Sequence, residues 1–196
     1  MARPRSYDHD ALRAATIRVA RRLLEEGGPP ALTARALAGA VGATPGTVYA
    51  VFGNLKAVLL EVNRETFLEL AAVIDAVPDG PPADWLARLA DAYVAFMLER
   101  RDVWRGLFEG PRETESFPPW YTELIDRLIE RIAAPLAELG AGPRARDLAE
   151  QLFVSVHGAV ALAAIGRLDM VTARPAQALA REAVETTVRA IGTGPA

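Results

Sequence analysis

The chain has 196 residues, contains no cysteine and carries a formal net charge of −3. The absence of cysteine excludes disulfide bonds, zinc–thiolate sites and cysteine nucleophiles. Residues 1–60 hold eight basic and four acidic residues, whereas residues 61–196 hold 14 basic and 21 acidic residues. This asymmetry predicts that only the N-terminal part meets a polyanion, with a chance distribution of charge as the alternative.

The start of the chain predicts a cytoplasmic protein. Its first ten residues contain no apolar run of the kind that a signal peptide requires. The longest strongly apolar stretch without charges, residues 151–166, is shorter than the ~20 residues that a membrane span needs. We therefore expect no membrane association.

Apolar residues recur at helical spacing along the whole chain, which predicts an all-α fold of about nine helices. Gly-Pro-rich breaks separate several of them, and Pro135 is expected to kink the end of its helix. The predicted helices lie at 12–23, 34–40, 45–51, 55–77, 85–97, 102–109, 121–136, 144–167 and 175–192.

The segment from Thr33 to Lys56 has the pattern of a helix-turn-helix. Thr33 and Thr44 are suited to cap two short helices, and Gly42 suits a tight turn that requires a positive φ. Pro45 then takes the first helical position, where a proline costs least. Such a second helix, held clear of the body, fits the major groove of duplex DNA, whereas the alternative is an ordinary helical hairpin. The positions predicted to face outward are Thr44, Gly46, Thr47, Tyr49 and Ala50.

Residues 32–52, which read LTARALAGAVGATPGTVYAVF, resemble the TetR family of transcriptional regulators. The shared pattern is a Thr-capped helix, a Gly turn, and a short recognition helix with an outward Tyr followed by Phe. The resemblance is close over residues 8–75 and extends further only in the number and order of helices. It implies a DNA-binding domain at residues 1–54 and a ligand-binding and dimerisation domain at residues 55–196, linked by the helix at 55–77.

The resemblance places DNA contacts on the two short helices and their caps. Only Arg35 among the candidates for base contacts has a side chain that can make a bidentate contact to guanine. We therefore expect part of the specificity to come from DNA shape and close backbone approach. The candidates are Arg35, Gly46 and Thr47 for bases, Thr33, Thr44 and Tyr49 for phosphates, and Pro45 at the start of the recognition helix.

The sequence departs from the family at the lysine that follows the recognition helix. That lysine falls at Leu55 here, and the only lysine of the chain, Lys56, lies one position later, about 100° further around the helix. Lys56 is interpreted either as a displaced phosphate contact or as a solvated side chain. Asn54, as the cap of the next helix, would leave N–H groups that can hold a phosphate.

Residues 152–165 are apolar or small almost all round, which predicts a helix that is covered on every side. One face would meet its own core and the other a partner chain. The helices near 144–167 and 175–192 together resemble the four-helix dimer interface of the family. A two-fold dimer would place its recognition helices about 34–36 Å apart on a palindrome, whereas the alternative is a core helix in a monomer.

Aromatic residues are concentrated between residues 85 and 121, which predicts an apolar ligand site, with ordinary core packing as the alternative. The run Phe-Val-Ser-Val-His-Gly at 153–158 resembles the motif of one TetR C-terminal subfamily, which has Trp in place of Phe153. His157 is interpreted either as a polar anchor for a ligand or as a hydrogen-bonded structural histidine. The predicted ligand-binding residues are Tyr93, Met97, Trp104, Phe108, Trp120, Tyr121, Phe153 and His157.

These observations predict a ligand-responsive regulator, a repressor that binds a palindromic operator as a homodimer and is released by a small hydrophobic effector. The chain has two histidines, no Gly-rich phosphate loop and no metal-ligand spacing, so we expect no enzymatic activity, no cofactor and no metal site. The alternatives are a DNA-architectural protein without effector control and an all-α enzyme. Activation instead of repression also stays open, since the sequence encodes neither the sign of regulation nor the effector, the operator or the regulated genes.

Overall fold

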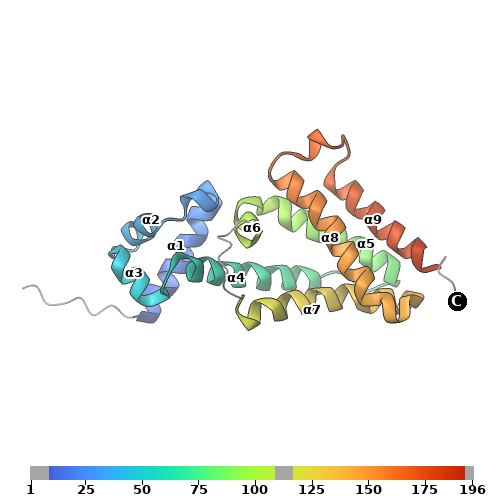
Figure 1. The fold of residues 1–196 in the computed structure, drawn as a ribbon, viewed down its shortest axis with the longest axis horizontal. Coiled ribbons are helices and arrows are strands. Elements are labelled where there is room, and N and C mark those ends of the chain that lie inside the picture. The colour runs from blue at the N-terminus through green and yellow to red at the C-terminus, as the bar shows by residue number, and fades with distance from the viewer. Residues whose placement is uncertain (1–8, 109–116, 193–196) are drawn as a thin grey trace, which may run out of the picture. The chain divides into compact units, whose positions relative to one another are not determined.

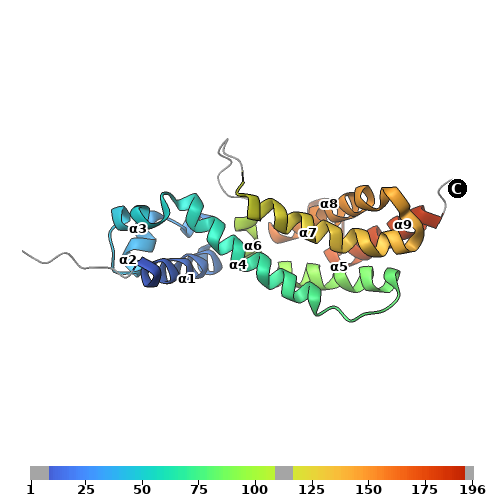
Figure 2. The same cartoon turned by 90° about the horizontal axis from the view of Figure 1, so that it is seen from below.

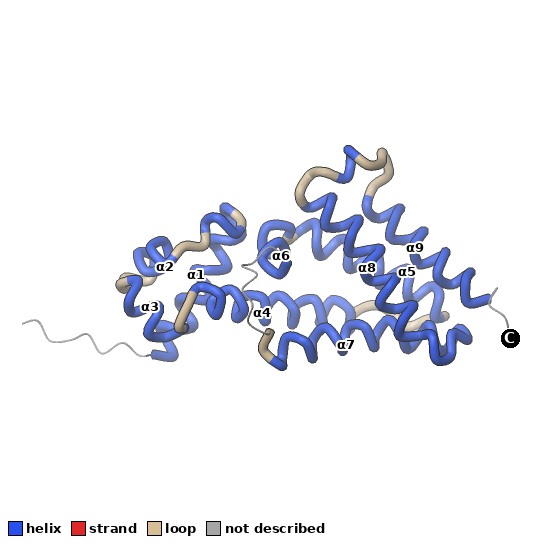
Figure 3. The backbone as a smooth tube through the Cα atoms, viewed as in Figure 1, coloured by secondary structure: helices blue, strands red, loops and turns tan. Residues whose placement is uncertain are grey.

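The computed structural model describes residues 9–108 and 117–192, apart from the side chains of residues 104 and 106–108. All regular structure in these ranges is helical, as Figures 1 and 3 show. The prediction of an all-α fold with about nine helices is therefore confirmed for the described residues. The helices are α1 His9–Gly27, α2 Ala34–Ala40, α3 Pro45–Phe52, α4 Leu55–Asp75, α5 Pro82–Glu99, α6 Arg101–Phe108, α7 Pro119–Leu136, α8 Ala145–Ala164 and α9 Ala176–Gly192.

Proline and glycine residues set several of the helix limits. Pro135 is buried and is the penultimate residue of α7, so this helix ends where a kink was predicted. A wider helical turn follows, and Gly140 leaves helical geometry there with a φ of 96°. No helix within the described residues is long and apolar enough to cross a membrane.

Contacts between Cα atoms divide the chain into two compact units. Within the described ranges, the first unit comprises residues 9–66 and 100–108, and the second comprises residues 67–99 and 117–192. Helix α4 contributes its first part to one unit and its last part to the other. The first unit thus continues past residue 54, the predicted end of the DNA-binding domain, and the functional boundary stays a prediction.

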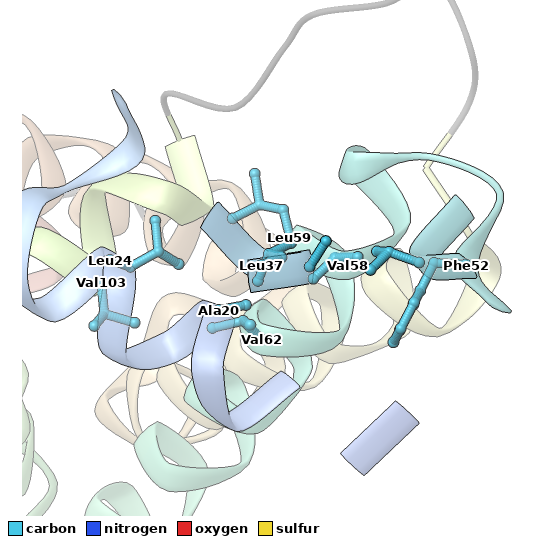
Figure 4. Close-up of a cluster of buried hydrophobic side chains, with 10 residues drawn as sticks. Ala20, Leu24, Leu37, Phe52, Val58, Leu59, Val62 and Val103 are labelled. Carbon is cyan, nitrogen blue, oxygen red and sulfur yellow. The ribbon is translucent and has the colours of Figure 1, made fainter. Parts of the chain in front are cut away.

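The first unit is built around one apolar cluster, shown in Figure 4. Leu24 of α1, Leu37 of α2 and Val48 of α3 are completely buried, and α4 adds Val62. Val103 of α6 joins the same cluster, so α6 packs with the N-terminal helices although it follows α5 in the chain. Because each fully buried aliphatic side chain contributes about 1.5–3 kcal/mol, this cluster fixes how the short helices α2 and α3 are held.

The second unit is a helical bundle. Helix α8 packs against both α7 and α9, and α5 packs against α9, as Figures 1 and 2 show. Leu86, Val94 and Met97 of α5 are almost completely buried, as are Leu136 of α7 and Val160 of α8. The core of the bundle therefore contains side chains of α5, α7 and α8.

Candidate DNA interface and effector pocket

Two threonine caps and one glycine turn fix the geometry of α2 and α3. The Thr33 Oγ1 atom accepts a hydrogen bond from the Ala36 backbone N–H at 3.2 Å, and the Thr44 Oγ1 atom accepts one from the Thr47 N–H at 3.1 Å. Between the helices, Gly42 has a φ of 67°, which a residue with a Cβ rarely adopts. The capped helices and the turn predicted from the sequence are therefore present.

One face of α3 is anchored and the other is open. Val48 and Phe52 are buried in the first unit, whereas the Tyr49 side chain is 41% exposed. Thr47 is half-buried, and its hydroxyl lies 2.9 Å from that of Thr44. The remaining residues predicted to face outward are exposed, namely Thr44, Gly46 and Ala50, and Pro45 is exposed as well.

The junction between α3 and α4 is a second capped turn. Gly53 has a φ of 80°, and its N–H donates to the Tyr49 carbonyl oxygen at 2.7 Å. The Asn54 Oδ1 atom then accepts a hydrogen bond from the Ala57 N–H at 2.8 Å, which confirms Asn54 as the cap of α4. The other N–H groups of the first turn of α4 have no partner inside the helix, and such a helix N-terminus favours an anion.

The basic candidates differ in exposure. Arg35 on α2 is exposed, whereas Lys56 and Leu55 at the start of α4 are both half-buried. Thr33 at the cap of α2 is exposed. The exposed Arg35, the caps of α2 to α4 and the open face of α3 all belong to the first unit, and the contact of each with DNA stays a prediction.

The sequence did not reveal one set of contacts that links α1 to α3 and α4. The Arg13 guanidinium of α1 lies over the Phe52 ring, with its Cζ atom 4.9 Å from the ring centroid, and it also forms an ion pair with Glu61 of α4. A cation–π contact of this kind contributes about 0.5–1 kcal/mol at a partly exposed site. The three residues are far apart in sequence and share no periodic pattern, so no local signal predicts their contact.

The predicted ligand-binding residues fall into separate groups in the second unit. Tyr93 of α5 lies beside Phe153 and His157 of α8, and its phenolic oxygen is 2.8 Å from the His157 Nδ1 atom. Burial lowers the pKa of His157 to about 4. A second aromatic group contains Trp120 and Tyr121, and Met97 is a buried residue of α5. The side chains of Trp104 and Phe108 lie outside the described residues.

The space available differs sharply between two places in this unit. The cavity beside Tyr93 and Phe153 has a volume of about 30 Å³. A groove of about 910 Å³ lies elsewhere, between the last part of α4, the start of α5 and α7. Trp85 of the aromatic run lines this groove, but none of the predicted ligand-binding residues with described side chains does. Sequence reasoning missed the groove because its walls come from three helices.

Helix α8 has an apolar side that nothing covers within the described residues. Val154 is 67% exposed, Ile165 at the end of the helix is 43% exposed, and Gly158 lies exposed on the same helix. Val156 and Val160 are buried in the bundle. The prediction of a helix with an inner and an outer apolar face therefore agrees with the exposure of its residues.

Several solved structures share this fold. A protein of unknown function from Rhodococcus sp. RHA1 is 26% identical, with a TM-score of 0.72, over 94% of this chain and 97% of that one. The TetR family regulator PfmR from Thermus thermophilus is 20% identical, with a TM-score of 0.62, over 89% and 97%. NalD of Pseudomonas aeruginosa, the secondary repressor of the MexAB-OprM multidrug efflux pump, is 21% identical, with a TM-score of 0.61, over 93% and 97%. No curated protein matches the sequence.

Two family models match the chain. Residues 17–62, which include α2 and α3, match the bacterial regulatory proteins of the tetR family. Residues 86–187, more than half of the chain, match the tetracyclin repressor-like C-terminal domain. The resemblance of Phe153 and His157 to the motif of one C-terminal subfamily stays a prediction. The agreement of both models with the capped helix-turn-helix and the helical bundle shows that this chain belongs to the TetR family of transcriptional regulators.

Proposed function

We propose that the chain is a repressor that binds a palindromic operator as a homodimer and leaves it when a small hydrophobic effector binds. The observation that carries the DNA-binding part is the open face of α3. Gly46, Tyr49 and Ala50 are exposed on it, while Val48 and Phe52 anchor the other face. A short helix presented in this way matches what entry into a major groove about 12 Å wide requires.

The polar groups around α3 support this role. The Thr44 hydroxyl caps α3 and Asn54 caps α4, so two helix N-termini with their positive dipole ends border the same short segment. Tyr49 adds an exposed phenol between them. We propose phosphate contacts from Thr33, Thr44, Tyr49, Asn54 and Lys56, and base contacts from Arg35, Gly46 and Thr47, with Pro45 at the entry of the helix.

The dimer is proposed from the outer face of α8. Val154 exposes an apolar side chain to solvent, and Gly158 would allow another helix to approach closely. A homodimer through α8 and α9 would cover this face. Two-fold symmetry would then present two copies of α3 to successive turns of a palindrome.

Effector control is the third part of the proposal. The second unit contains a groove with room for a small molecule, and its wall includes the last part of α4, a helix that also enters the core of the first unit. We propose no enzymatic activity, and we place the protein in the cytoplasm, where its operator would be found. The second candidate function is a DNA-architectural protein without effector control. Such a protein would bind duplex DNA with low sequence preference, whereas the proposed repressor would prefer its operator.

The test is selection of bound sequences from random duplex DNA by the purified full chain, followed by fluorescence anisotropy on the selected site. We expect a palindrome with half-sites one helical turn apart, and affinity that falls steeply with salt because phosphates are contacted. Binding to every duplex with equal affinity would favour the architectural protein. No binding to duplex DNA at low salt would contradict the proposal altogether.

A matched pair of variants links the binding to α3. Thr47→Asp places a negative charge in the first turn of α3, which the helix tolerates. The same charge would be repelled by the phosphates that flank the bases Thr47 is proposed to contact. Thr122→Asp makes the same change in the first turn of α7 in the second unit. Only Thr47→Asp should abolish operator binding, and equal effects of both variants would refute the assignment of α3.

A further inference from the structure

A groove of about 910 Å³ lies in the second unit between α4, α5 and α7. Ligand pockets usually measure roughly 300–1,000 Å³ and have apolar walls. Its apolar lining residues include Leu70, Ala71 and Ile74 of α4 and Leu128 of α7. The cavity beside Tyr93 and Phe153, at about 30 Å³, is too small for any organic effector.

We propose that this groove binds the effector and that the effector is a hydrophobic organic cation. The inference rests on the proposed function in one respect, namely that the bound molecule controls DNA binding. The site and the charge of its ligand follow from the groove itself.

Aromatic residues at the groove favour a cation. Phe67 and Trp85 line it, and the face of an aromatic ring attracts positive charge. The Phe67 ring is held in place by Tyr121, whose ring meets it edge-on with the centroids 5.2 Å apart. An apolar cation would therefore bury its hydrocarbon against the aliphatic wall while its charge contacts aromatic rings.

The charged residues around the groove are predominantly acidic. Two guanidinium groups, those of Arg127 and Arg131, face a larger number of carboxylates. A same-sign excess of this kind attracts the opposite charge and raises its local concentration. The five carboxylates that line the groove belong to Asp75, Asp79, Asp126, Glu130 and Glu138.

Ion pairs within the unit leave part of this excess uncompensated. Asp75 pairs with Arg131, and Arg146 lies within 3 Å of carboxylate oxygens of both Asp126 and Glu130. Two carboxylates of the groove, Asp79 and Glu138, have no ion-pair partner among the described residues, and neither has Arg127. A cation would gain most from these two carboxylates, whereas Arg127, the one basic residue of the described lining that has no carboxylate partner, would attract an anion.

Helix α4 is one continuous helix that belongs both to this site and to the core of the first unit. Its last part lines the groove with Leu70 and Ile74, and its first part places Val58 and Val62 in the core that holds α3. If α4 can adopt two positions and the ligand binds more tightly to the protein in one of them, the ligand shifts the equilibrium toward that position. The size of the shift is set by the difference between its two affinities. The groove is therefore a site from which DNA binding can be controlled.

The test uses two ions of the same shape and opposite charge, tetraphenylphosphonium and tetraphenylborate, titrated into the full-length protein by calorimetry. Quenching of tryptophan fluorescence provides a second readout, since Trp85 lines the groove. We expect the cation to bind about tenfold more tightly than the anion, which corresponds to about 1.4 kcal/mol. Equal affinities would overturn the assignment of charge.

Charge variants then identify the residues responsible. The double variant Asp79→Asn/Glu138→Gln should weaken the cation and reduce the ratio between the two ions toward one. Arg127→Gln should strengthen the cation by removing the like charge. An unchanged ratio in both variants would contradict the inference.

Two neighbouring alanines of α4 provide a matched test of location. Ala71 lines the groove, whereas Ala72 is exposed on the same helix and does not line it. Ala71→Trp should fill the groove and abolish binding of the cation, and Ala72→Trp should leave it unchanged, with circular dichroism showing that both variants remain folded. If Ala71→Trp binds the cation as the unaltered chain does, the groove is not the site.

Operator binding separates this inference from the proposed function. If the cation occupies the groove but operator DNA is not released, the site stands and effector control fails. If the protein binds its operator and another compound releases it while the cation does not bind, the proposed function stands and this inference fails.

Discussion

The phenolic oxygen of Tyr93 lies 2.8 Å from the Nδ1 atom of His157, joining α5 to α8 inside the bundle. The His157 ring also lies 5.2 Å, centroid to centroid, from that of Phe153 one turn earlier on α8. Burial among these groups lowers the pKa of His157 to about 4, so the imidazole is neutral near pH 7. This hydrogen bond agrees with the interpretation of His157 as a structural histidine. The role of His157 as an anchor for a ligand stays a prediction.

This pair makes stability depend on pH. An unfolded histidine has a pKa near 6.5, so between pH 6.5 and pH 4 the unfolded chain takes up the His157 proton more readily than the folded chain does. The free energy of unfolding should therefore fall as the pH drops through this window, and His157 should add nothing further below it. Urea denaturation at half-unit pH steps measures this decrease.

Two variants separate the histidine from other titrating groups. His157→Gln should flatten the pH dependence between pH 6.5 and pH 4 relative to the unaltered chain. Tyr93→Phe should keep the slope, because burial is what lowers the pKa, while costing about 0.5–1.5 kcal/mol for the lost hydrogen bond. Identical slopes for His157→Gln and the unaltered chain would disprove the assignment.

Two glycines of the helix-turn-helix should respond in opposite ways to alanine. At Gly42 a Cβ would meet no atom within 4 Å, so only the positive φ penalises it, and Gly42→Ala should destabilise the protein by about 1–2 kcal/mol. Gly46 lies inside α3 with ordinary helical geometry, and Gly46→Ala should stabilise it by about 0.5–1 kcal/mol. Chemical denaturation of both variants measures the two changes.

The same pair also separates folding from DNA binding. Gly46 is exposed on α3, where a methyl group would hold the helix away from the bases it is proposed to approach. Gly46→Ala should therefore weaken operator binding although it stabilises the protein. Unchanged affinity for Gly46→Ala would argue against close approach of the DNA at this residue.

Arg35 and Tyr49 should differ in how their loss affects DNA binding. The exposed Arg35 is the candidate for a bidentate guanine contact, so Arg35→Ala should cost about 1–3 kcal/mol on the operator and little on scrambled DNA. Tyr49→Ala should weaken both DNAs by similar factors, because a phosphate contact carries no sequence information. Anisotropy titrations on both duplexes decide, and equal losses for the two variants would defeat the assignment.

The helix-turn-helix was predictable because its determinants are local. Thr33, Thr44 and Asn54 each bond to an N–H group three residues later, and Gly42 acts through its own backbone. Caps and turns of this kind depend on neighbouring residues alone, so they can be recognised in a sequence. The contact of Arg13 with Phe52 and the packing of Val103 in the first unit depend on residues far apart in the chain, and no pattern reveals them.

The groove between α4, α5 and α7 was not predictable, for a related reason. Aromatic density indicated a cavity, but aromatic rings also fill space well, and Tyr93 packs against Phe153 with about 30 Å³ left beside them. A cavity is the volume that packing leaves unfilled, so its position depends on how whole helices meet. The groove beside Trp85 arises in this way from three helices, none of which shows it alone.

The exposed side of α8 gives the clearest test of the dimer. Val154 is 67% exposed, and an arginine there would have to be buried without a partner if α8 meets α8 or α9 of a second chain. Val154→Arg should therefore give a monomer in light scattering and reduce affinity for the palindrome toward that of a single half-site. Ala72→Arg, the same charge on an exposed position of α4, should remain a dimer with full affinity. A Val154→Arg protein that stays dimeric would place the interface elsewhere, and an unaltered chain that is monomeric would remove the two-fold arrangement on which operator spacing depends.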